Sequence, residues 1–187
     1  MITAFLRDHP QIDITLNLAD RVVHLIDDHI DLALRIGHLP DSALKAVRVG
    51  QTQQVVGASP GYLAARGMPQ GPADLATHAC ISVSNLGQPQ VWAFDGLPQP
   101  VAIHPRLILS TAEAAIDAAI SGLGLTRVLC YQIAAARAAG KLVTVLEPYQ
   151  PKPVPISLVY PGQGLLPLKL RAFLDFAAPR LRAALAP

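Results

Sequence analysis

Polar side chains that follow predicted strands are the first candidates for chemistry in this chain. In α/β proteins, ligands bind at the carboxyl ends of strands, where side chains and backbone groups of several loops meet. Arg127 is able to neutralise a carboxylate through two parallel hydrogen bonds, and its alternative is a surface ion pair. The predicted ligand-binding residues are Asp20, Arg21, Ile36, Gly37, Ser82, Ser84, Asn85, Thr111, Thr126 and Arg127.

The segment Ser110–Glu113 has the S-x-x-E form of a capping box and predicts the start of an Ala/Ile-rich helix. The N-terminus of a helix offers free N–H groups and a partial positive charge, which together bind anions. The alternative is an ordinary capping box, in which Glu113 uses one of those donors. The sequence leaves both interpretations open.

The segment Gly57–Gly61 spells G-x-S-x-G, the pattern around the nucleophile of α/β-hydrolases, with Ser59 at its centre. That nucleophile elbow uses the backbone N–H of the residue after the serine to stabilise the oxyanion. Here this residue is Pro60, which has no N–H. A strand that ends in a turn is the better interpretation, and a serine hydrolase is kept as the alternative.

No catalytic residue, metal site or cofactor is predicted. The glycines of Gly122–Gly124 follow a predicted helix instead of opening one after a strand, which favours a helix cap over a dinucleotide site. The adjacent carboxylates Asp27 and Asp28 fit a solvated helix surface, and the six histidines lack the spacing of metal ligands. Cys80 and Cys130 are expected to be reduced thiols.

Composition limits the class of protein. The chain has 187 residues, of which 51% are hydrophobic, so it can bury a sizeable core. Its net charge is +2, and its Lys and Arg are scattered, whereas a surface that binds duplex DNA clusters them on one face. The sequence shows neither a signal peptide nor an apolar run of the roughly 20 residues that span a membrane. We therefore expect a cytoplasmic protein.

The stretch Leu16–Leu44 predicts the framework of the first half of the chain. Alternating apolar residues in Ile12–Leu18 indicate a strand, and Asp20 is placed to cap the helix that follows. The apolar run Leu32–Leu34 indicates a buried strand. A strand, a crossover helix and a second strand at this spacing predict a parallel βαβ unit.

The rest of the chain alternates short apolar runs with helical patterns. The order predicts two α/β lobes, between which the chain crosses near Gly50–Gln54 and Pro151–Ile156. Further strands are predicted at Ala46–Val49, Gln53–Ser59, Cys80–Val83, Val91–Phe94, Val101–His104, Arg106–Leu109, Leu125–Leu129, Leu142–Leu146 and Ile156–Tyr160. Further helices are predicted at Ile2–His9, Tyr62–Arg66, Pro72–Leu75, Tyr131–Ala139 and Leu166–Leu185, the last kinked or split by Pro179.

Several of these segments carry a resemblance to a known family. The run D-R-x-V-x-L-I-x-x-x-x-D-L-A-L-R-I-G-x-L-P-D-S-x-L (Asp20–Leu44) resembles the signature of the effector-binding domain of LysR-type transcriptional regulators. The segments FLRDHPQIDITL, VVGASPGYLAARGMPQGPADLATHACI and ISLVYP are similar to further family motifs and follow in family order. The resemblance covers about Phe5 to Leu185.

The resemblance implies an α/β fold of two Rossmann-like lobes, like type 2 periplasmic binding proteins, joined by two crossover strands. Lobe I would comprise residues 1–52 and 156–187, and lobe II residues 53–155. It also implies a small-molecule effector, which we expect to be a carboxylate, bound in the cleft between the lobes. The predicted partners are a second copy of the chain, which would pair through Ile12–Leu18 and Asp20–His29, and a tetramer of the full-length protein.

The sequence departs from the family pattern at its start. The helix-turn-helix, the linker helix and the first strand of lobe I are expected before residue 1, so lobe I would be N-terminally incomplete. DNA would be bound only through that missing domain, and neither a membrane nor a cofactor is expected as a partner. The function predicted is effector sensing, not catalysis. The alternatives are the hydrolase centred on Ser59 and a dimeric remnant without a ligand.

Overall fold

The computed structural model describes residues 1–18, 24–39, 44–84, 90–162 and 164–185. The chain folds into two compact units, which are described separately. Unit 1 is formed by Met1–Thr52 together with Val154–Pro187, and unit 2 by Gln53–Pro153. The chain therefore passes between the units twice.

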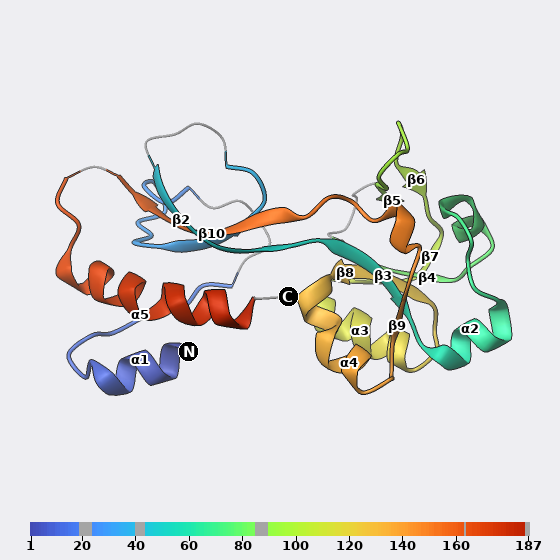
Figure 1. Cartoon of the computed structure of the whole chain (residues 1–187), viewed down its shortest axis with the longest axis horizontal. Helices are drawn as coiled ribbons and strands as arrows, with labels where there is room; N and C mark the ends of the chain where they lie inside the picture. The colour runs from blue at the N-terminus through green and yellow to red at the C-terminus, as the bar shows by residue number, and fades with distance from the viewer. Residues whose placement is uncertain (19–23, 40–43, 85–89, 163, 186–187) are drawn as a thin grey trace. The chain divides into compact units, whose positions relative to one another are not determined.

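Unit 1 is built on a three-stranded antiparallel sheet in the order β1-β10-β2 (Figure 1). Its strands are β1 (Ala33–Ile36), β2 (Leu44–Thr52) and β10 (Val154–Pro161). Helix α5 (Leu168–Ala184) packs along one face of this sheet, where Leu170 and Leu174 join Val49, Ile156 and Leu158 in one core. Burial of this apolar stripe holds the helix to the sheet.

Helix α1 (Ile2–Asp8) completes the core of unit 1 through a single aromatic residue. Phe5 is fully buried, and its ring lies edge-on to Phe173 and Phe176 of α5, with centroids 5.0 and 5.3 Å away. Pro179 lies inside α5, which continues through it, so the predicted split does not occur.

Two predictions for unit 1 are wrong. Ile12–Leu18 forms no strand, and Leu16 and Leu18 are 60% and 85% exposed. An alternating pattern becomes a strand only beside a neighbour that takes its backbone hydrogen bonds, and β1 has β10 as its only partner among the described strands. The predicted parallel βαβ unit is therefore absent from the described structure, and the sheet is antiparallel.

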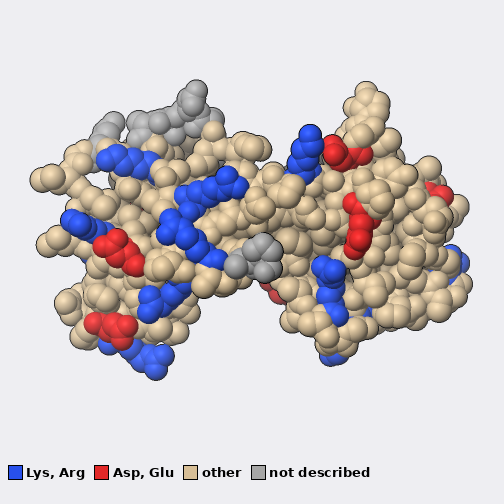
Figure 2. Space-filling view, in the orientation of Figure 1, with Lys and Arg blue, Asp and Glu red and all other residues tan. Residues whose placement is uncertain are grey.

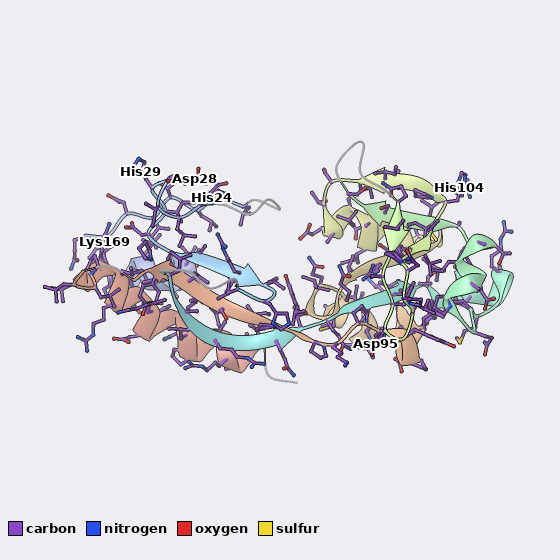
Figure 3. All side chains as sticks on the ribbon, turned by 90° about the horizontal axis from the view of Figure 1, so that it is seen from above. His24, Asp28, His29, Asp95, His104 and Lys169 are labelled. Atoms are coloured by element: carbon purple, nitrogen blue, oxygen red, sulfur yellow. The ribbon has the colours of Figure 1, made fainter. Side chains whose placement is uncertain are left out.

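The predicted helix that begins at Asp20 is the second error. Asp20 lies outside the described residues, and in the described part of the predicted helix residues 25–29 form a turn. The N–H groups of Asp28 and Ile30 donate to the carbonyls of His24 and Leu25, both at 2.8 Å. His29 has a φ of 53°, a left-handed conformation that ends helical geometry. Figure 3 shows His24, Asp28 and His29 together in this turn.

Unit 2 is built on a five-stranded mixed sheet in the order β7-β4-β8-β3-β9. Strand β4 runs parallel to β7 and β8, whereas β3 runs antiparallel to β8 and β9. The strands are β3 (Gln54–Ala58), β4 (Cys80–Val83), β7 (Pro105–Leu109), β8 (Leu125–Leu129) and β9 (Val143–Val145). All five lie within or next to predicted strands.

Two apolar cores cover the two faces of the unit 2 sheet. On one face, α3 (Ala112–Ile120) packs against Val55, Ile81 and Val128, with α4 (Ala134–Ala138) beside it (Figure 1). On the other face, Val56, Cys80 and Leu125 pack against the remaining elements. Those elements are α2 (Pro60–Arg66), η1 (Pro72–Ala76), β5 (Val91–Trp92) and β6 (Val101–Ala102). Consecutive residues Val55 and Val56 thus face opposite cores, as strand geometry requires.

Local signals in unit 2 are confirmed with small changes. Strands β5 and β6 pair antiparallel across an insert in which Gly96 has a φ of 76°. The predicted helix Tyr131–Ala139 is a 3-10 turn, η2 (Cys130–Ile133), followed by the short α4. A second 3-10 turn, η3 (Glu147–Tyr149), precedes the extended proline-rich segment that leads to β10.

Candidate functional site

The face of the unit 2 sheet opposite α3 brings together three of the predicted residues. Arg127 lies two residues beyond Leu125 on β8, and Ser82 lies two residues beyond Cys80 on β4, so both pairs share a face. Ile81 pairs with Thr126 across the parallel strands. Ser82 and Arg127, the next residues of each strand, are therefore neighbours, and Ser84 follows on the same side.

Arg127 is half-buried and lies beside an aromatic ring. Its guanidinium carbon is 5.8 Å from the ring centroid of Phe94, within the range of a cation–π contact. Burial lowers the pKa of Arg127 to about 10, because a low-dielectric surrounding disfavours the charged form. Among the described residues no carboxylate lies within 4.0 Å of it. The guanidinium is thus a partly desolvated cation without a counter-ion in the described part of the chain.

Arg127, Ser82 and Ser84 form a polar strip on this face of the sheet, and the two serines extend it past the end of β4. The Ser82 hydroxyl lies 3.5 Å from that of Ser84, which accepts a 2.9 Å hydrogen bond from the Gln90 side-chain amide. The Ser84 N–H donates to the carbonyl of Leu109 at 3.0 Å, which ties the end of β4 to β7. Asn85, the next predicted residue, lies outside the described residues.

Sequence reasoning missed Gln90 and Phe94 as members of this site. Both lie in the insert around β5, where no pattern of spacing relates them to β4 or β8. The insert folds over the sheet, and this fold brings Gln90 into hydrogen-bond contact with Ser84 and Phe94 into contact with Arg127.

Thr111 and Thr126 are separated from this strip. Thr111 is the N-cap of α3, and its hydroxyl accepts the Ala114 N–H at 3.4 Å, so the cap is Thr111 and not the predicted Ser110. Thr126 lies inside β8 rather than after a strand, and alternation turns it toward α3, away from Arg127. It is fully buried, and its hydroxyl has no hydrogen-bond partner among the described residues.

The remaining predicted residues belong to unit 1. Ile36 ends β1 with 40% of its surface exposed. Gly37 follows with a φ of 118°, and its N–H donates to the carbonyl of Pro155 at 2.9 Å. A side chain at position 37 would be strained, so glycine is required to turn the chain there. Asp20 and Arg21 lie outside the described residues.

Ser59 has a structural role. It is the N-cap of α2, and its hydroxyl accepts the N–H of Tyr62 at 3.3 Å. The nearby His78 contacts the hydroxyl of Tyr62, 3.0 Å from Nδ1, instead of the serine. A nucleophilic serine needs a base within hydrogen-bond reach, and the described residues give Ser59 none.

The described residues also offer no group suited to binding a metal ion and no helix suited to spanning a membrane. No group of three His, Cys, Asp or Glu is placed to hold a metal ion in the described part of the chain. Cys80 and Cys130 are not in a disulfide in the described structure, and the first is buried and the second half-buried. Among the described helices, none has the length and apolar character needed to cross a membrane.

Comparison with known proteins identifies the fold and then the family. The regulatory domain of CrgA, a LysR-type transcriptional regulator from Neisseria meningitidis, superposes with a TM-score of 0.80 at 32% identity, over 96% of this chain and 89% of that one. The regulatory domain of AphB from Vibrio vulnificus superposes with a TM-score of 0.82 at 26% identity, over 96% and 89%. The fold is thus the two-lobed α/β fold of regulatory domains that resemble periplasmic binding proteins.

Residues 1–182 match the family described as the LysR substrate binding domain. The chain is also 33% identical over 183 residues to the HTH-type transcriptional regulator CrgA of Neisseria meningitidis serogroup C, covering 97% of this chain. The chain therefore belongs to the LysR substrate-binding domain family. It spans 61% of the length of that CrgA relative.

Proposed function

We propose that unit 2 binds a carboxylate effector through Arg127, with Ser82 and Ser84 beside it. The proposal is supported by one observation above the others, the half-buried guanidinium of Arg127 that lacks a counter-ion among the described residues. A charge taken out of water is costly unless it is paired. A bound carboxylate would supply the missing charge through two parallel hydrogen bonds.

The surroundings of Arg127 favour an organic acid over a bare ion. Phe94 offers an aromatic ring next to the guanidinium, against which an apolar body can pack. The hydroxyls of Ser82 and Ser84 supply further donors and acceptors along the same strip. Ile36, Gly37, Thr111 and Thr126 stay predicted effector residues.

The response to the effector is proposed to pass through assembly with a second copy of the chain. Leu16, Leu18 and Ile26 expose 60%, 85% and 57% of their surface on unit 1. Exposed apolar residues are typical of interaction surfaces when they form a patch, and these three residues fall in the segments predicted to pair in a dimer. We propose a homodimer, a tetramer in the full-length protein, and a place in the cytoplasm.

DNA recognition is assigned to another part of the full-length protein. The relatives bear the name HTH-type transcriptional regulator and are longer than this chain. On the face drawn in Figure 2, Lys and Arg are interspersed with Asp and Glu, whereas duplex DNA calls for a continuous basic surface. We propose that this chain senses the effector, that DNA is bound elsewhere, and that the chain catalyses no reaction, since Ser59 caps a helix.

A thermal-shift screen of aromatic and aliphatic carboxylates tests the effector site. At least one acid is expected to raise the Tm of the chain, because a ligand that binds only the folded state stabilises it. The shift should disappear in Arg127→Gln and persist in Arg137→Gln, which removes an exposed cation of α4. The matching uncharged amide should have no effect. If every acid leaves the Tm unchanged, or if the shift survives Arg127→Gln, the proposed site is wrong.

A further inference from the structure

A second candidate site lies in unit 2, at the end of the sheet opposite to Ser82 and Ser84. A cavity of about 610 Å³ is lined by the residues that follow β3, those that follow α3 and those around the starts of β4 and β7. Because β3 runs antiparallel to β8, which is parallel to β4, its carboxyl end meets the amino end of β4. The nine residues of α3 place Thr111 about 13 Å from this end, at 1.5 Å per residue.

The cavity is lined by several positively charged side chains. Its lining includes Arg66, Arg106 and Lys141 but contains neither Asp nor Glu. The sequence of Gln53–Pro153 has six Lys and Arg in all, namely Arg66, Arg106, Arg127, Arg137, Lys141 and Lys152. Half of the cations of unit 2 therefore border one cavity.

These three cations have no ion-pair partner among the described residues. All three are exposed, so each keeps its hydration and costs little without a partner. Three like charges at one concave surface nevertheless raise the local concentration of anions, because clefts with low-dielectric walls focus the field.

A buried hydroxyl adds a directional donor to the cavity. Ser59 is 6% exposed, and its oxygen accepts the N–H of Tyr62. Its own proton has no acceptor among the described residues, so it is free to donate to a ligand.

Three of the last four carbonyl groups of α3, which would repel an anion, accept hydrogen bonds. The Asp117 carbonyl accepts the N–H of Ser121 at 3.0 Å and its hydroxyl at 2.9 Å. The carbonyls of Ala118 and Ala119 accept the N–H groups of Leu123 and Gly122 at 3.1 and 3.0 Å. The negative end of the helix is therefore largely compensated by its own cap.

We propose that this cavity binds the phosphate group of a small phosphorylated molecule. Arg and Lys are the side chains that bind phosphate, and the volume is in the range of small-molecule sites. Apolar lining residues, among them Ile120 and Leu123, give the remainder of such a molecule a surface to contact.

Isothermal titration calorimetry with pyrophosphate, at ionic strength held constant with KCl, tests the proposal. Saturable binding is expected. Arg106→Gln and Lys141→Gln should each weaken it about threefold, and the double variant about tenfold, as expected for exposed charge pairs. Arg137→Gln and Lys152→Gln remove exposed cations of unit 2 outside the cavity and should leave the Kd unchanged. Succinate, a dicarboxylate, should bind more weakly than pyrophosphate.

Four results would overturn the proposal. They are the absence of saturable binding, an unchanged Kd in the double variant, an equal loss in the two control variants, and succinate binding as tightly as pyrophosphate. Backbone amide NMR shifts locate the ligand independently, since Gly61, Ser121 and Gly122 should move and Ser84 should not. Arg127→Gln is expected to leave pyrophosphate binding intact, so this proposal and the carboxylate site fail or stand separately.

Discussion

Gly124 packs against Ala79 so closely that a Cβ atom at position 124 would collide with the carbonyl oxygen of Ala79. The same carbonyl accepts the N–H of Leu125 at 2.9 Å. This contact joins the start of β8 to the residue before β4, the two strands that carry Arg127 and Ser82. The spacing of the predicted carboxylate site therefore depends on a glycine three residues before Arg127, outside the site itself.

Gly124→Ala is expected to lower the free energy of unfolding by about 2–4 kcal/mol, because a backbone atom cannot move aside without separating β4 from β8. Gly61→Ala is the matched control. A Cβ at position 61 meets no atom within 4 Å, and alanine in a helix is favoured over glycine by about 0.5–1 kcal/mol. Urea unfolding of both variants measures the difference, and equal stabilities would contradict the close contact.

Tyr62 is expected to stabilise the same region through its hydroxyl. That hydroxyl contacts Nδ1 of His78 at 3.0 Å and accepts the N–H of Ala79 at 2.9 Å. Tyr62→Phe leaves both groups without this partner and should cost about 1–3 kcal/mol of unfolding free energy. Tyr131→Phe removes a hydroxyl from a residue that is 45% exposed and should change stability by less than about 0.5 kcal/mol. A loss shared by both variants would argue against the buried network.

The structure of unit 2 was largely predictable because its signals are local. Cys80–Val83 and Leu125–Leu129 form strands with the predicted bounds, since apolar runs bounded by turn residues need little context. Ile12–Leu18 has an equally clear alternation and forms no strand. A strand depends on a neighbour, and alternation within one segment does not reveal whether that neighbour is present.

In the candidate carboxylate site, too, local features were predictable from the sequence and contacts between distant segments were not. Arg127 was predicted from its side-chain chemistry, and Ser82 and Ser84 from their place at the carboxyl end of a strand. That these residues lie on one face follows from the parallel pairing of β4 with β8, which joins segments 45 residues apart in register (Ile81 with Thr126). Gln90 and Phe94 carry no signal in the sequence, because an insert with irregular structure brings them to the site.

Cys80 is expected to react far more slowly than Cys130. Burial raises the pKa of the Cys80 thiol to about 11, and the thiolate is the reactive form. The unfolded chain, with the ordinary thiol pKa, loses this proton first, so the thiol's contribution to stability should fall as pH rises from about 9 to 11. Alkylation by iodoacetamide at pH 8, followed by mass spectrometry, should modify Cys130 alone. Equal labelling of the two thiols in the folded chain would contradict the burial.

Arg127→Met is expected to separate binding from stability. The folded pKa of Arg127, about 10, is below its ordinary value, so the unfolded chain holds the proton more tightly. Stability should therefore rise only between those two pH values, and at pH 7 the charge opposes folding. Met keeps much of the apolar stem and removes the charge, so the unfolding free energy without ligand should stay equal or rise by up to about 1 kcal/mol.

The same substitution should abolish the thermal shift caused by a carboxylate, because the bidentate partner is gone. Such an outcome is typical of a functional group that is kept at the expense of stability. Urea unfolding with and without the acid measures both quantities in one series, with Arg137→Met as the control for loss of an exposed cation. If Arg127→Met costs more than about 1 kcal/mol in the absence of ligand, the guanidinium stabilises the fold itself, and its assignment to the effector has to be withdrawn.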